Sequence, residues 1–168
     1  MIVFEEKIRE LVSLLPAHVD GSGTYPIRYD WGTVDVLNKF LVLPENVSKY
    51  PLIWLTNGKD ADDTVWNTVT RNARLVIATR STNVDKFNEF QVKNDYNNIL
   101  IPVYQNFITV LEKSGICVVI DQKVDKELSP NYSVNDNGNG LITTWNALVI
   151  DLEIRIEGNK CINNNIKF

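Results

Sequence analysis

The residues best suited to chemistry are three charged side chains near the end of the chain, Asp151, Glu153 and Arg155. They alternate with apolar residues, so in an extended strand they share one face. Paired carboxylates followed by a basic residue are typical of metal-dependent nucleases, in which the carboxylates bind Mg²⁺ and a lysine helps to position water. Arginine replaces that lysine here, and its guanidinium stays protonated. A nuclease or other enzyme that uses Asp151 and Glu153 is therefore the alternative interpretation, and a strand that faces solvent or a partner is favoured.

Other groups capable of catalysis are sparse. His18 is the single histidine of the chain, and no cysteine or second histidine lies at metal-ligand spacing from it. The glycine pairs, Gly21-Ser-Gly23 and Gly138-Asn-Gly140, lack the lysine and the spacing of a phosphate-binding loop. No nucleophile can be paired with a base. We therefore expect that the protein is not an enzyme and that it has no catalytic residue, metal site or cofactor.

The charged residues belong to an unusually long predicted strand. From Leu148 to Ile156 every even position is apolar, and the odd positions carry Val149 and then charged residues from Asp151 to Glu157, which predicts an apolar face toward the core and a largely charged face outward. If the strand begins near Leu141, it has about 16 residues and spans roughly 50 Å at about 3.3 Å per residue. Ordinary strands have about five or six residues. A strand this long exceeds what a small domain needs for its own sheet, which points to a partner.

The remaining pattern predicts one α+β domain over residues 1–157 and a polar tail over 158–168. Apolar residues at helical spacing predict two main helices, over 2–15 and 96–114. Residues 125–140 are dense in turn formers and are predicted to form a loop. Alternating or continuous apolar runs predict a mostly antiparallel sheet that packs against the helices and ends in a long C-terminal strand or hairpin. Its predicted strands cover 26–43 (one strand or a hairpin), 51–56, 69–80, 116–123 and 141–157.

The composition is that of a globular protein without a basic surface. The chain has 168 residues, 44% of them hydrophobic, and a formal net charge of −4. This balance argues against a face that binds nucleic acid phosphates. No window approaches the ~18 apolar residues of a membrane span, so we expect no membrane partner. Cys117 lies in an apolar run and Cys161 in the polar tail, which favours two free thiols in a reducing compartment.

Several stretches of sequence together carry a resemblance to a known family. An amphipathic N-terminal helix is followed by Tyr50-Pro-Leu-Ile-Trp54 and by Arg74-Leu-Val-Ile-Ala-Thr79 with a Ser-Thr-Asn turn. Then Asp95-Tyr-Asn-Asn-Ile-Leu-Ile-Pro-Val-Tyr104 opens a helix that ends in Leu-Glu-Lys-Ser-Gly115, and Trp145-Asn-Ala-Leu-Val-Ile-Asp-Leu-Glu-Ile closes the pattern. Over residues 2–157, this order resembles the tail-terminator and head–tail joining (neck, or connector) proteins of tailed bacteriophages.

The resemblance implies a structural protein of the virion. Members of this family form homo-oligomeric rings, hexamers or dodecamers, at the head–tail interface or at the tail end, and DNA passes through the ring. The chain would then be assembled in the host cytoplasm and would lie in the neck or tail beside portal, neck or tail proteins. Its acidic balance suits a lumen through which DNA slides without sequence-specific binding, because repeated negative charge repels phosphates.

A ring built from heterologous contacts needs two different surfaces on each subunit. We expect the first on the charged face of the last strand, at Asp151, Glu153 and Arg155, and the second near Arg71 and Arg74. The resemblance further implies that the predicted 125–140 loop projects toward the lumen or an adjacent ring. The candidate contact residues of that loop are Asn135, Asp136, Asn137 and Asn139.

Overall fold

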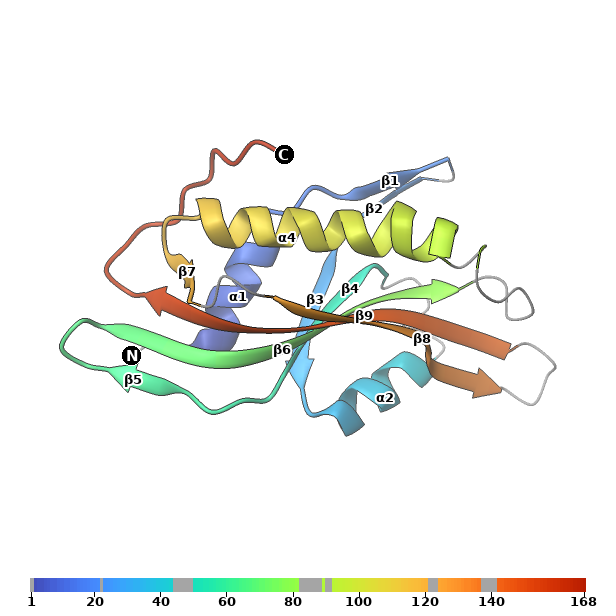
Figure 1. The fold of residues 1–168 in the computed structure, drawn as a ribbon, viewed down its shortest axis with the longest axis horizontal. Helices are drawn as coiled ribbons and strands as arrows, with labels where there is room; N and C mark the ends of the chain where they lie inside the picture. Colours follow the sequence, from blue (N-terminus) through green and yellow to red (C-terminus); the bar gives the residue numbers. More distant parts are fainter. Residues whose placement is uncertain are drawn as a thin grey trace.

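The centre of the fold is a pair of long antiparallel strands, β6 (Thr68–Ser81) and β9 (Ile142–Glu157) (Figure 1). The computed structural model describes residues 2–21, 23–43, 50–81, 89, 92–120, 124–136 and 142–168. Strand β9 has 16 residues, and its alternate apolar side chains from Leu148 to Ile156 are buried. The prediction of an unusually long strand with one apolar face is therefore confirmed.

Shorter strands flank this pair on both sides. Among the described strands the order is β3–β4–β6–β9–β7, while β5 pairs with β6 and β8 pairs with β9. The β3–β4 pair is parallel and the other pairs are antiparallel, which confirms the mostly antiparallel α+β prediction. The strand bounds are β1 His18–Asp20, β2 Gly23–Tyr25, β3 Arg28–Gly32, β4 Leu52–Thr56, β5 Ala61–Asp63, β7 Cys117–Val119 and β8 Asp125–Asp136.

Helices lie on opposite sides of the sheet (Figure 1). On one side, α1 (Phe4–Val12) and α4 (Ile101–Lys113) cover the large core, and the π-helix η2 (Val92–Leu100) precedes α4. Pro102 lies at the start of α4, where its missing N–H leaves no helical hydrogen bond unmade. On the other side, α2 (Val34–Val42) covers a smaller core built around Trp54 and Trp145. In addition to the two predicted main helices, the fold therefore contains a third helix, α2, on the opposite face of the sheet.

The segment predicted as a loop at 125–140 is largely a strand. Residues 125–136 form β8, which pairs with β9 over its whole length apart from a register shift between Ser129 and Ser133. The turn formers Pro130 and Asn131 lie at that shift, and Asn131 has a positive φ of 54°. Turn-forming residues are therefore concentrated in a bulge, while pairing with β9 keeps the flanking residues extended.

The prediction of one strand or a hairpin over 26–43 is also wrong. Only Arg28–Gly32 is a strand, and Thr33 then caps α2, because its hydroxyl accepts a hydrogen bond from the Val36 amide at 3.3 Å. The side chains that α2 buries are Leu37 and Leu41, four residues apart, as on one side of a helix. Between α1 and β3, strands β1 and β2 form a separate antiparallel hairpin.

The polar tail lies beside α4 (Figure 1). The Asn163 amide donates to the Ser114 carbonyl at 2.8 Å, and Ile162 and Ile166 pack against the large core. Both cysteines are free, with Cys117 buried and Cys161 exposed, as predicted. Of the helices that the structure describes, none combines the length and hydropathy required to cross a bilayer.

Candidate functional site

The most distinctive surface is the part of the sheet that α2 leaves uncovered. Helix α2 packs on Trp54, Val76 and Trp145. Further along the same face, β6 and β9 carry polar side chains directly opposite one another, with Arg74 facing Asp151 and Thr70 facing Arg155. These side chains are exposed or half-buried. We call this surface the open face, comprising Thr68, Thr70, Asn72, Arg74, Asp151, Glu153, Arg155 and Glu157.

The charges on the open face are paired loosely with one another, although Glu157 Oε2 also lies 2.6 Å from Lys160 Nζ, outside that face. Arg74 Nη1 lies 3.9 Å from Asp151 Oδ2, and the two side chains are 53% and 52% exposed. Arg155 Nη2 and Glu157 Oε1 are also 3.9 Å apart. Exposed ion pairs of this kind contribute at most about 1 kcal/mol each. The open face can therefore exchange these contacts for contacts with a partner at little cost.

The predicted carboxylates lie among charges of both signs. The side chain of Asp151 lies beside Arg74, so a cation bound there would meet a guanidinium at close range. Within the described residues, no group of three or more His, Cys, Asp or Glu side chains could hold a metal ion. The arrangement at Asp151 and Glu153 is that of a mixed-charge surface.

The prediction that Arg71 and Arg74 share a surface is wrong. Strand residues three apart point to opposite faces, so Arg74 joins Asp151 on the open face while Arg71 points into the large core. Arg71 is 3% exposed and forms ion pairs with Glu5, at 2.7 Å, and with Asp60. Its guanidinium carbon lies 4.3 Å from the centre of the Phe4 ring. Burial alone would lower the pKa of Arg71, but hydrogen bonds to Asp60 and Glu5 outweigh burial and raise it.

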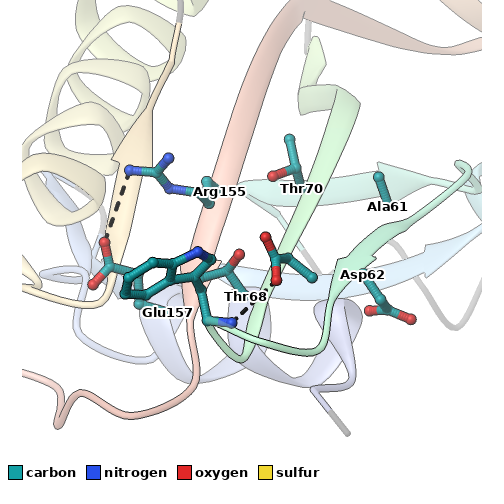
Figure 2. Close-up of a pocket in the computed structure, with 8 residues that line it drawn as sticks. Ala61, Asp62, Thr68, Thr70, Arg155 and Glu157 are labelled. Atoms are coloured by element: carbon teal, nitrogen blue, oxygen red, sulfur yellow. Dashed lines mark hydrogen bonds and ion pairs between the residues drawn. The ribbon is translucent and has the colours of Figure 1, made fainter.

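The open face ends in a hollow of about 530 Å³ beside the β5–β6 turn. Figure 2 shows Arg155 and Glu157 from β9 beside Thr68 and Thr70 from β6, with β5 as the neighbouring strand. The turn adds Trp66, whose side chain lines the hollow and is nevertheless 73% exposed. Trp66 is not among the site residues predicted from the sequence. The available signal was an apolar pair, Val65-Trp66, in an otherwise polar segment.

A second cavity, of about 570 Å³, lies at the other end of β6. Aromatic rings form one wall, since the Tyr25 ring stacks 5.8 Å from the Tyr50 ring and 6.4 Å from the His18 ring. The rest of the lining comes from β1, β6 and η2, namely Val19, Asp20, Arg80, Asn94, Asp95, Asn98 and Ile99. His18 Nε2 and Arg80 Nε are buried and have no hydrogen-bond partner among the described residues. Unsatisfied buried groups of this kind are uncommon and invite a ligand or partner.

A buried carboxyl group, Asp95, also lines this second cavity. Asn146 Nδ2 donates a hydrogen bond to Asp95 Oδ2 at 2.7 Å. Burial raises the pKa of Asp95, and hydrogen bonds from Ser81 and Asn146 offset this only in part. The cavity thus joins β1, β2, β6 and η2 around polar groups that are distant in sequence.

The predicted loop contacts fall at the end of β8. Asn135 pairs with Thr143 and Asp136 with Ile142 of β9, so these two residues belong to the sheet and the prediction of a loop is wrong for them. Asn137 and Asn139 lie outside the described residues.

Comparison with known proteins adds no relative. A scan of the chain against protein-family models gives no match, and a search of curated proteins likewise finds no similar sequence. The functional proposal therefore rests on the sequence pattern and on the surfaces described above.

Proposed function

We propose that the chain is a structural subunit of a bacteriophage virion that assembles into a homo-oligomeric ring at the head–tail interface or at the tail end. The observation that carries the proposal is the open face, a part of the central sheet that no described helix of the chain covers. The resemblance of the sequence to tail-terminator and neck proteins suggests the virion context of this proposal. The protein acts by binding its own copies and neighbouring virion proteins, with no catalysis.

The open face has the chemistry of a subunit contact. From Asp151 to Glu157 it extends roughly 20 Å along β9 at about 3.3 Å per residue. Its charges are of both signs, and Val118 and Ile120 add half-exposed apolar groups on the neighbouring strand edge. Apolar groups surrounded by adaptable polar ones are characteristic of protein interfaces. Mixed charges also set orientation, because a wrongly docked copy places like charges together.

Charge further supports passage of DNA through such a ring. The chain has 21 acidic and 17 basic residues, so the protein has no excess of cations with which to hold phosphates. A lumen lined by such subunits repels the DNA backbone weakly and releases few counterions on contact. DNA then moves through the ring without specific binding. Six-fold or twelve-fold symmetry belongs to this proposal.

The test is whether reversing the charge of the open face abolishes the ring. The double variant Asp151→Lys, Glu153→Lys is compared with Glu6→Lys, Glu10→Lys, a matched control that makes the same charge change on exposed positions of α1. Native mass spectrometry and negative-stain microscopy over a range of protein concentrations give the subunit number.

We expect rings from the wild type and the α1 control, and monomers from the open-face variant. Rings that survive the open-face reversal would remove this surface from the contact. A wild type that never assembles, alone or with portal and tail proteins, would overturn the ring itself. Plasmid cleavage in Mg²⁺ that is lost in Asp151→Ala would favour the nuclease alternative.

A further inference from the structure

A closed ring needs a second surface that the open face can bind, and this inference rests on the proposed function. The surface near Arg71 and Arg74, predicted from the sequence, cannot be that second surface, because Arg74 lies on the open face itself and Arg71 is buried. A heterologous contact requires two unlike surfaces at a distance from each other on the same subunit. The described part of the chain offers a pair of this kind, an exposed tryptophan and an aromatic cavity.

The first member of the pair is Trp66, in the turn between β5 and β6. Its side chain is 73% exposed, which is unusual for the largest apolar residue. The turn that presents it is ordered, since Asp63 Oδ1 accepts hydrogen bonds from the amides of Val65, at 2.9 Å, and Trp66, at 3.1 Å. A rigidly presented tryptophan is a typical anchor of a protein interface. Trp66 is also continuous with the open face, because it lines the same hollow as Arg155 and Glu157.

The second member is the cavity at the opposite end of β6. Tyr25, Tyr50 and Ile99 give it apolar and aromatic walls, against which an indole ring can stack. His18 Nε2 and Arg80 Nε have no partner among the described residues. In its neutral form His18 can accept the hydrogen bond that an indole N–H donates. Arg80 can pair with Asp62, an exposed acidic residue that lines the hollow beside Trp66.

Distance prevents the two from meeting within one subunit. They lie beyond opposite ends of β6, whose 14 residues span roughly 46 Å at about 3.3 Å per residue. We propose that Trp66 of one subunit inserts into the cavity lined by His18, Tyr25 and Tyr50 of a second copy, and that this head-to-tail contact joins neighbouring subunits of the ring. The same contact repeated around an axis leaves no Trp66 and no cavity unoccupied.

The test uses two variants that each destroy one half of the contact. Trp66→Ala removes the anchor and leaves the cavity intact. Asn98→Trp, at an exposed position on the cavity lining, blocks the cavity and leaves the anchor intact. Trp31→Ala is the matched control, because Trp31 is an exposed tryptophan on the edge strand β3. Sedimentation velocity over a concentration series measures the midpoint of assembly for each protein.

We expect Trp66→Ala and Asn98→Trp each to raise that midpoint by about 30-fold or more, the effect of an interface anchor worth about 2 kcal/mol. Trp31→Ala should assemble as the wild type does. A one-to-one mixture of Trp66→Ala and Asn98→Trp should form heterodimers and nothing larger, because the mixture retains a single productive pair of anchor and cavity. The emission of Trp66, obtained by subtracting the spectrum of Trp66→Ala from that of the wild type, should shift to the blue when the wild type assembles.

Other results would each decide against the contact. Rings formed by Trp66→Ala at the wild-type concentration would overturn the inference and leave the ring proposal standing. Absence of heterodimers in the mixture, when both single variants fail to assemble, would show that Trp66 binds elsewhere. A wild type that is monomeric at every concentration would overturn this contact together with self-assembly into a ring.

Discussion

Replacing Arg71 with methionine should destabilise the fold strongly, because this arginine is buried and not part of a subunit surface. The substitution keeps an unbranched side chain of similar length and removes the positive charge between Glu5 and Asp60. The two carboxylates then repel one another beside the large core. The Phe4 ring also loses the cation that lies 4.3 Å from its centre.

The size of the effect follows from burial. Removing one partner of a fully buried ion pair costs about 3–5 kcal/mol, because the remaining charge is left unpaired. Glu5 and Asp60 keep 17% and 32% of their side-chain surface exposed, so water can solvate them in part, which places the expected loss near the lower limit, at about 3 kcal/mol. For a chain of this length, that corresponds to a fall in Tm of roughly 6–12 °C.

Urea unfolding followed by the fluorescence of the buried Trp54 and Trp145 measures the change. The matched control is Arg74→Met, the same substitution on the same strand at an exposed position, for which we expect a loss below about 1 kcal/mol. Adding Glu5→Gln and Asp60→Asn to Arg71→Met should restore part of the stability, because the uncompensated charges are then gone. Equal stabilities for Arg71→Met and Arg74→Met would refute the reasoning.

Three further outcomes are expected. Burial raises the pKa of Asp95 in the folded state, so between the ordinary and the raised pKa the folded protein binds more protons than the unfolded chain. The stability that this proton binding contributes is lost as the pH rises through the raised pKa. In urea titrations from pH 4 to pH 7, Asp95→Asn should therefore gain stability relative to the wild type. Gly32→Ala should lower the unfolding free energy by about 1–3 kcal/mol, since Gly32 has a φ of 154° and an added Cβ would lie 3.1 Å from the Trp54 ring. A thiol reagent should modify Cys161 alone in the native protein and both cysteines after unfolding, because Cys117 is buried and burial raises its thiol pKa to about 12.

Elements with a long regular pattern could be predicted from the sequence, and elements that depend on a distant partner could not. Strand β9 is visible because its even positions are apolar from Leu148 to Ile156 and its odd positions are charged from Asp151 to Glu157. Strand β8 is hidden, because Asp125–Asp136 contains turn formers that become part of a sheet only by pairing with β9. Local preference there conflicts with tertiary pairing, and pairing prevails.

The odd or even position of a residue along β6 could have corrected the prediction for Arg71. On β6, odd positions such as Val69, Leu75 and Ile77 face the large core, so the odd position 71 faces it too. The second cavity offered no comparable signal. Its lining comes from β1, β2, β6, η2 and Tyr50, and no local pattern brings such segments together.

The extent of the open face can be recognised in the sequence, because the residues on one face of β6 and β9 change from polar to apolar at one point along each strand. On β6 the even positions are polar up to Arg74 and apolar at Val76 and Ala78, and on β9 the matching change lies between Val149 and Asp151. These switches are directly opposite one another in the sheet. Helix α2 has nine residues, about 14 Å at about 1.5 Å per residue, so it can cover only a fraction of strands of roughly 46–53 Å. Because the apolar residues end where α2 ends, the uncovered part of the sheet is polar and can remain in water before assembly. On assembly, a partner with a complementary pattern of charges can replace the water around these side chains.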